Sequence, residues 1–189
     1  MAISSDSGLL TVEDYYRLVE EGILSEYDRV ELIEGRIVKM APIGDDHLAA
    51  TVDLTNAFVA RFYGRADFLI QSPIDLGRRC EPEPDFAIVR AVPGGRRRAK
   101  ARKPTPAEVY LIVEVANSSL SFDLGEKAAM YTRHGIRELW VVDIPHDRLW
   151  VHREPTADGY ASVRVLARGE TIAAIAFPDV SFATDEILG

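Results

Sequence analysis

The segment that most constrains the fold is residues 109–116, VYLIVEVA, a nearly continuous apolar run rich in β-branched side chains. Such a run predicts a strand at the centre of a sheet, covered on both faces. Strand alternation would place its single acid, Glu114, on one face with Ile112 and Tyr110. A carboxylate costs several kcal/mol to bury alone, so Glu114 either reaches water at a strand end, pairs with an arginine, or serves a functional site.

Two more charged residues flank this strand in the sequence. Asp85 follows Pro84 and opens the apolar segment DFAIV, although an Asp after a proline can also simply form a turn. Lys127 lies on a predicted helix that Asp123 would cap and Gly135 would end, with Tyr131 four residues further on. A lysine on a helix is most often solvated, which remains the alternative for Lys127.

Taken together, these residues favour a metal-dependent phosphodiesterase site. Two carboxylates at the ends of neighbouring strands can hold one Mg²⁺, whose remaining ligands are water and phosphate oxygens. A nearby ammonium group would orient the attacking water or stabilise the developing charge. The hypothesis requires that Asp85 and Glu114 lie close enough to share an ion.

The rest of the chain predicts a mixed α/β domain over residues 11–189, preceded by a tail at residues 1–10. Thr11 would cap a helix reaching Gly22, and Glu34-Gly35 would turn a hairpin between two short strands. Asp45 or Asp46 would cap a second helix that ends near residue 62. We expect the buried stripe of that helix to consist of Leu48, Val52, Val59 and Phe62.

Charge and composition narrow the function. The net charge of −8 and pI near 5.0 argue against a protein that binds nucleic acid over its whole surface. Six of the 22 cations nevertheless fall within the eight residues 96–103, which we call the basic loop. This loop would either follow a nucleic-acid backbone or simply be solvated. Its cations are Arg96, Arg97, Arg98, Lys100, Arg102 and Lys103.

The same composition bears on the compartment. The single cysteine, Cys80, excludes an internal disulfide, and no stretch has the length and apolarity of a membrane span or a signal peptide. A cytoplasmic protein without a membrane partner is therefore expected.

Several motifs carry a resemblance to a known family. The PD of Pro84-Asp85, VEVANSSL, FDLGEKAAMYTRHGIRELWVVD and the N-terminal RVELIEGRIVKMAP together resemble the Uma-two family of restriction endonucleases, a branch of the PD-(D/E)xK nucleases. The similarity runs from about Thr11 to the C-terminal FPDVSFATDEIL. It implies an α/β, restriction-endonuclease-like core, namely a mixed central β-sheet flanked by helices with additional antiparallel strands.

The resemblance also implies the site residues. Asp85 and Glu114 match the two acids, and Glu31 matches an acid on the N-terminal hairpin, so all three would bind Mg²⁺ or Mn²⁺. Position 116, where a simple (D/E)xK motif has lysine, is Ala116, and Lys127 matches an amine supplied by the next helix. The implied catalytic set is thus Glu31, Asp85, Glu114 and Lys127.

Neighbouring residues have simpler interpretations. Glu31 can be an exposed hairpin acid, and His47 a structural residue that opens a helix. Asp123 is interpreted mostly as a helix cap, and Tyr131 as a packing residue with a polar tip.

We therefore predict a Mg²⁺-dependent DNA endonuclease, which would act as a homodimer if it cuts both strands through two-fold symmetry. A catalytically silent module that binds nucleic acid or protein on a nuclease fold is the main alternative. A metal hydrolase acting on a small phosphoester is a third.

Overall fold

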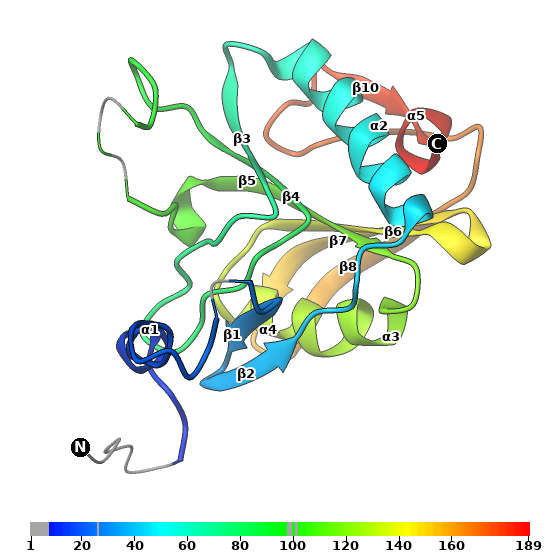
Figure 1. Ribbon diagram of the computed structural model, residues 1–189. Helices are drawn as coiled ribbons and strands as arrows, with labels where there is room; N and C mark the ends of the chain where they lie inside the picture. The colour runs from blue at the N-terminus through cyan, green and yellow to red at the C-terminus, as the bar shows by residue number, and fades with distance from the viewer. Residues whose placement is uncertain (1–7, 26, 98–99, 101) are drawn as a thin grey trace.

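A six-stranded sheet in the order β3-β4-β5-β6-β7-β8 forms the centre of the protein (Figure 1). In this computed structural model the described residues are 8–25, 27–97, 100 and 102–189. β5 and β6 pair in parallel, and every other neighbouring pair is antiparallel, so the sheet is mixed as predicted. Its strands are β3 (Ala66–Ile70), β4 (Phe86–Arg90), β5 (Val109–Ala116), β6 (Glu138–Asp143), β7 (Arg148–Thr156) and β8 (Gly159–Leu166).

The central strand β5 has the predicted boundaries but not the predicted alternation throughout. Ile88 of β4 pairs with Leu111, whereas the next residue, Val89, pairs with Val109. Tyr110 is therefore the extra residue of a β-bulge, and it packs against the opposite apolar cluster from Ile112. The expectation that Tyr110 shares a face with Glu114 is wrong for this reason, while that for Ile112 is confirmed.

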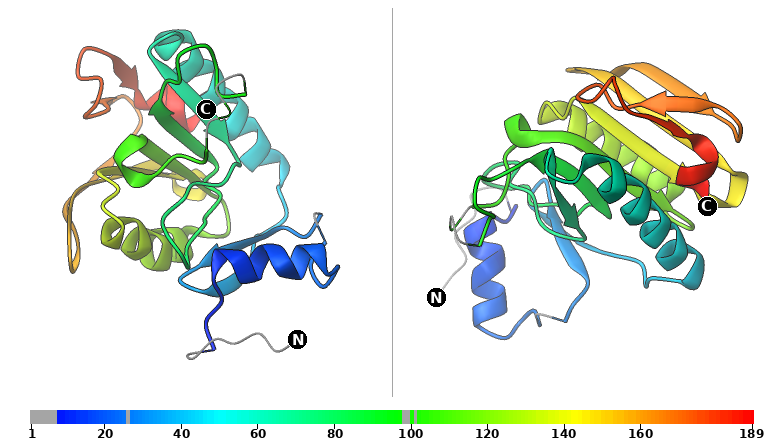
Figure 2. Two further views of the ribbon diagram at one scale, coloured as in Figure 1. Left: turned by 90° about the vertical axis from the view of Figure 1, so that its left-hand side faces the viewer. Right: turned by 90° about the horizontal axis from the view of Figure 1, so that it is seen from above.

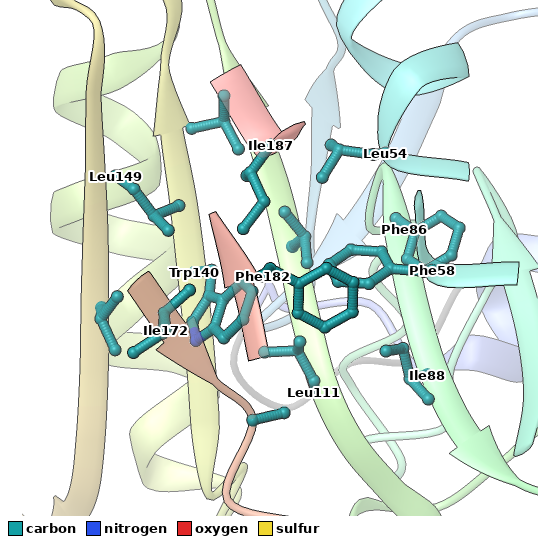
Figure 3. Packing of buried hydrophobic residues seen from close by; sticks show 14 of the residues in the cluster. Leu54, Phe58, Phe86, Ile88, Leu111, Trp140, Leu149, Ile172, Phe182 and Ile187 are labelled. Atoms are coloured by element: carbon teal, nitrogen blue, oxygen red, sulfur yellow. The ribbon is translucent and has the colours of Figure 1, made fainter. Parts of the chain in front are cut away.

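Helix α2 (Asp45–Phe62) covers one face of the sheet and builds the larger core (Figures 1 and 3). Phe58 lies at the middle of this core. The centroid of its ring is 5.2 Å from the ring centroid of Phe86, 4.9 Å from that of Phe182 and 6.0 Å from that of Trp140. Aromatic rings at these separations and tilts pack favourably beyond the area they bury. This cluster fixes α2 rigidly on the sheet, and its first turn thereby acquires a fixed position.

The prediction from the sequence placed the wrong face of α2 in the core. The buried side chains are Ala50, Thr51, Leu54, Phe58 and Phe62, of which only Phe62 belonged to the expected stripe. Leu48 and Val52 are 55% and 48% exposed. The N-cap is Gly44 without a side-chain cap, so neither Asp45 nor Asp46 caps the helix; both instead lie in the first turn, where they favour the helix dipole.

The other face of the sheet carries the helical segment that follows β5 (Figure 1). It consists of α3 (Leu120–Phe122), a π-helical turn η2 (Asp123–Lys127) and α4 (Ala128–Arg133). Gly135 ends the segment with φ of 75°, as expected.

The hairpin of β1 (Val30–Ile33) and β2 (Arg36–Lys39) lies beside α1 (Val12–Glu20), and both views of Figure 2 show them together. Thr11 caps α1 through a capping box with Asp14, as predicted. Glu34 and Gly35 both have positive φ, 49° and 78°, which is the conformation of a two-residue type I′ turn.

Contacts to the hairpin begin before Thr11. The backbone N–H of Leu10 donates to the carbonyl of Gly35 at 2.8 Å, so the segment expected to be a tail contacts the hairpin at this residue. Residues 1–7 of that tail lie outside the described residues.

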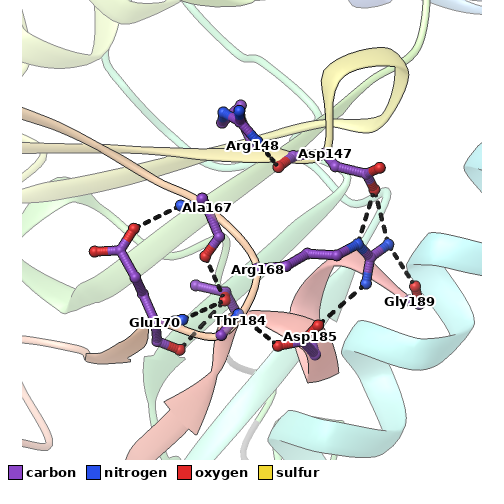
Figure 4. A network of polar contacts seen from close by, with 9 residues as sticks. Asp147, Arg148, Ala167, Arg168, Glu170, Thr184, Asp185 and Gly189 are labelled. Carbon is purple, nitrogen blue, oxygen red and sulfur yellow. Dashed lines mark hydrogen bonds and ion pairs between the residues drawn. The ribbon is translucent and has the colours of Figure 1, made fainter.

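The C-terminal segment closes the larger core. It contains the antiparallel pair β9 (Thr171–Ala173) and β10 (Ser181–Ala183), followed by α5 (Thr184–Leu188). Arg168 holds its end in place through Asp147, Asp185 and the carbonyl of Gly189 (Figure 4). The short turns η1 (Pro106–Glu108) and η3 (Ile144–His146) complete the elements. Across the described residues, no helix combines the length and apolarity needed to cross a membrane.

Candidate active site

A pocket of about 360 Å³ opens between the hairpin, the first turn of α2, the end of β5 and the α3–η2 segment. All four residues of the expected catalytic set line it: Glu31, Asp85, Glu114 and Lys127. They come from four separate elements or their ends, and only the folded sheet brings them together.

Glu114 lies at the base of this pocket with 1% of its surface exposed. Its Oε1 accepts hydrogen bonds from Lys127 Nζ at 3.1 Å and from the Tyr131 hydroxyl at 2.6 Å. Lys127 Nζ also lies 3.2 Å from Glu31 Oε1. The buried ammonium thus bridges two carboxylates, and Tyr131, expected mainly to pack, helps to hold the central one.

Burial has the largest effect on the pKa of Glu114. It raises the pKa of the Glu114 carboxyl to about 8, although Lys127 acts in the opposite direction. For Lys127, burial alone would lower the pKa, but the charges of Glu114 and Glu31 outweigh it and hold the pKa above the ordinary lysine value. Lys127 is therefore a permanent cation of the pocket.

Asp85 is placed beside Glu114 by the pairing of β4 with β5. Its Oδ2 accepts from the backbone N–H of Val115 at 2.8 Å, the residue next to Glu114. Its Oδ1 lies 3.0 Å from His47 Nε2 and 3.4 Å from Gln71 Nε2. Burial acts to raise the pKa of Asp85, but the His47 contact and the Val115 amide prevail and lower it, so Asp85 is ionised at neutral pH.

His47 therefore belongs to the site, which its position at a helix start did not reveal. The first turn of α2 directs its Nε2 at Asp85, while its Nδ1 is buried without a hydrogen-bond partner among the described residues. A signal was available, since the family resemblance covers the start of this helix. A lone histidine, however, carries too little information for an assignment.

The π-helical turn η2 explains how Lys127 reaches the strand. The backbone N–H of Ala128 donates to the carbonyl of Asp123, five residues earlier, which places one extra residue in the turn. Asp123 is not the expected cap, because the helical segment begins three residues earlier. Asp123 is instead buried at the pocket wall, where it accepts from the Ser119 hydroxyl at 2.6 Å.

The basic loop lies elsewhere. None of its described cations lines the pocket, and Figure 1 shows the loop at the opposite edge from the α3 segment. Arg96 pairs with Asp67, Arg102 with Glu108 and Lys103 with Glu81.

Two other cations of the basic loop, Arg97 and Lys100, are exposed, and Arg98 lies outside the described residues. A backbone-binding role for this loop stays a prediction. Besides Lys127, the pocket is lined by two cations that the sequence did not distinguish from other surface charges: Arg29, just before β1, and Lys39, the last residue of β2.

The donor chemistry of the pocket suits a hard divalent cation. Four carboxyl groups, from Glu31, Asp85, Glu114 and Asp123, act on a single buried lysine, so the pocket has more acidic groups than this one ammonium can balance when they are ionised. Both hydrogen bonds to Glu114 described above use Oε1, which leaves Oε2 as a ligand atom. Carboxylate oxygens are the ligands that Mg²⁺ and Mn²⁺ prefer.

The pocket does not contain a tight triad of acidic ligands. Among the described residues, the one group of three His, Cys, Asp or Glu ligand atoms within 4.8 Å of each other lies outside this pocket. Asp85 and Glu114 would therefore hold an ion together with water and substrate oxygens. Glu31 is engaged with Lys127 and with the backbone N–H of Glu83, at 3.1 Å, and its role as a ligand stays a prediction.

Comparisons with known proteins identify the family and the fold. The Uma2 family model, described as "Putative restriction endonuclease", matches residues 12–185. A crystal structure of a putative nuclease from Anabaena variabilis superposes with a TM-score of 0.74 at 14% identity, covering 95% of this chain and 97% of that one. A comparison with curated proteins gave no match. The predicted restriction-endonuclease-like core is thereby confirmed.

Proposed function

Because this chain belongs to the Uma2 family of restriction-endonuclease-like proteins, we propose that it is a divalent-metal-dependent endonuclease that hydrolyses DNA phosphodiester bonds. One observation carries the proposal: Asp85, Glu114 and the buried ammonium of Lys127 line one pocket although they come from three different elements. Burying a lysine among carboxylates is costly, and such arrangements concentrate at functional sites.

In this proposal Asp85 and Glu114 hold Mg²⁺ or Mn²⁺, with Glu31 assisting. The ion, when bound, neutralises charge on the scissile phosphate and lowers the pKa of a coordinated water. Lys127 directs its donors toward the attacking water and the developing phosphate charge, and Glu31 keeps the ammonium in place.

The remaining pocket residues position these groups. His47 and the Val115 amide orient the two oxygens of Asp85, and Tyr131 fixes the rotamer of Glu114. Arg29 and Lys39 at the wall can bind phosphates of the bound strand, which would make binding weaken as salt rises.

The test is nicking of supercoiled plasmid by the full chain with Mg²⁺ or Mn²⁺ present. We expect cleavage by the wild type and at least a hundredfold loss in Asp85→Asn and Lys127→Ala. Asp158→Ala, an exposed acid in the β7–β8 turn, is the matched control and should cleave like the wild type. Circular dichroism of each variant separates lost chemistry from lost folding.

Cleavage that survives both pocket substitutions would refute the assignment. Tight DNA binding without cleavage under either metal would favour the silent module instead. RNA and single-stranded DNA, offered in parallel, determine the substrate class.

The expected homodimer is part of the same proposal. Strand β8 is an edge of the sheet and carries the exposed Val163 and Val165, which offer an apolar surface for a second copy. Analytical ultracentrifugation of the wild type and Val163→Asp would test this, since a monomeric wild type contradicts it.

A further inference from the structure

A second group of metal-ligand side chains lies at the turn of the β1–β2 hairpin. Glu34, Cys80 and His134 each offer one ligand atom, and these atoms all lie within 4.8 Å of one another. His134 Nε2 is 3.1 Å from Glu34 Oε1. None of the three lines the pocket that holds Glu114, so this group is separate from the nuclease site.

The three residues come from segments far apart in the sequence. Glu34 occupies the hairpin turn, Cys80 lies in the connection between β3 and β4, and His134 follows the last turn of α4. Cys80 is 2% exposed, whereas the side chains of Glu34 and His134 are partly open to solvent. The thiol thus forms the floor of a site whose outer side an ion can reach.

We propose that Glu34, Cys80 and His134 bind Zn²⁺, with water as the fourth ligand. Thiolate, imidazole and carboxylate are the ligands that zinc takes in proteins, and soft sulfur selects it over Mg²⁺. Tetrahedral zinc with bonds of about 2.0–2.3 Å separates its ligand atoms by roughly 3.3–3.6 Å. The observed 3.1 Å contact and the 4.8 Å limit bracket that separation, so only small side-chain movements are needed.

The conformation of Glu34 supports this assignment independently. Its φ of 49° lies in the left-handed region, where the first position of a type I′ turn normally has Asn, Asp or Gly. A glutamate there is disfavoured, which suits a residue retained for its side chain.

Zinc binding is coupled to a proton. Burial raises the pKa of the Cys80 thiol to about 11, so the thiol is protonated in the metal-free protein. Forming the zinc–sulfur bond breaks the S–H bond and releases one proton to solvent, and a coordinating thiol is deprotonated outright.

Bound zinc would connect the three segments that carry the catalytic groups. The hairpin holds Glu31, the Cys80 connection leads into Asp85, and the helix before His134 holds Lys127. The metal would stabilise the nuclease pocket from outside, without contact with substrate.

Cobalt substitution provides the test. The full chain, stripped with a chelator, is titrated with Co²⁺ and then with Zn²⁺. We expect one equivalent of Co²⁺ to give a thiolate-to-cobalt charge-transfer band in the near ultraviolet, and Zn²⁺ to abolish it. Since Cys80 is the only cysteine in the sequence, this band reports on Cys80 alone.

Calorimetric Zn²⁺ titrations of variants complete the test. Cys80→Ser, His134→Gln and Glu34→Gln should each bind at least tenfold more weakly than the wild type. His146→Gln removes an exposed histidine paired with Asp143 and is the matched control. If Cys80→Ser fails to fold, the other two variants still report on the site.

A wild type without the charge-transfer band, or equal Zn²⁺ affinity in wild type and His134→Gln, would overturn the proposal. The zinc proposal and the nuclease proposal can fail independently of each other. Asp85→Asn should lose DNA cleavage but keep the cobalt spectrum of the wild type.

Discussion

Replacing Glu114 with glutamine should remove activity and yet make the protein more stable at neutral pH. Glutamine keeps an oxygen that can accept from Lys127 and Tyr131, as Oε1 of Glu114 does. It cannot ionise, however. The stability difference between wild type and variant therefore reports the cost of ionising a carboxyl at the base of the pocket.

The size and sign follow from the pKa. The Glu114 carboxyl has a pKa of about 8 in the folded protein and 4.5 ordinarily. Between these values the folded chain holds a proton that the unfolded chain has released, so wild-type stability falls by about 1.4 kcal/mol per pH unit. The stabilisation that Glu114 provides by holding this proton in the folded state is fully present below pH 4.5 and is lost once the pH passes about 8. From pH 5.5 to 7.5 we expect Glu114→Gln to gain roughly 3 kcal/mol relative to wild type.

The assay is urea unfolding at pH 5.5, 6.5 and 7.5 in the presence of a chelator, followed by tryptophan fluorescence. Trp140 is fully buried and reports on the core. Other titrating groups such as Asp123 are present in both proteins, and their effects cancel to first order. Glu20→Gln, which removes an exposed acid of α1, controls for the change in net charge.

Equal pH slopes for wild type and Glu114→Gln would refute the reasoning. They would mean that Glu114 is ionised throughout this range, with Lys127 compensating its charge completely. A gain in the Glu20→Gln control as large as in the variant would point to net charge instead of burial.

Three further outcomes are expected. Gly35→Ala should lower stability by about 1–3 kcal/mol, because an added Cβ would lie 2.7 Å from Leu9 Cβ. Gly64→Ala is the control, since Gly64 also has a positive φ, 77°, but open space around it, so this variant measures the backbone cost alone. Equal melting temperatures for Gly35→Ala and Gly64→Ala would contradict the prediction. Phe58→Ala should cost about 3–5 kcal/mol in urea unfolding, since it empties the centre of the aromatic core. Tyr131→Phe should slow plasmid nicking about tenfold while stability drops by only about 1 kcal/mol, and unchanged nicking would exclude a positioning role.

Elements with strong local signals were predictable from the sequence. The run at residues 109–116 became β5 with those same ends, and the Glu34-Gly35 pair turned the hairpin as expected. Both signals are local, because a β-branched run and a two-residue turn with glycine have few other stable conformations.

The errors arose where tertiary contacts decide between near-equal local options. Helix α2 has apolar side chains on more than one face, so the sequence could not choose between Leu48 and Leu54 for the core. The bulge at Tyr110 changes one residue in a continuous apolar run and leaves no mark in the pattern. The pocket acids were found through their cost of burial and the family likeness, while His47, Arg29 and Lys39 carried no comparable signal.

The π-helical turn η2 makes the position of the Lys127 ammonium depend on a single residue of chain length. A π-turn is a helical turn that accommodates one extra residue, so the regular helical turns on either side of it keep their register. Losing one residue between Asp123 and Lys127 would therefore tighten this turn to a regular α-helix and displace mainly the side chains of the turn itself, among them Lys127.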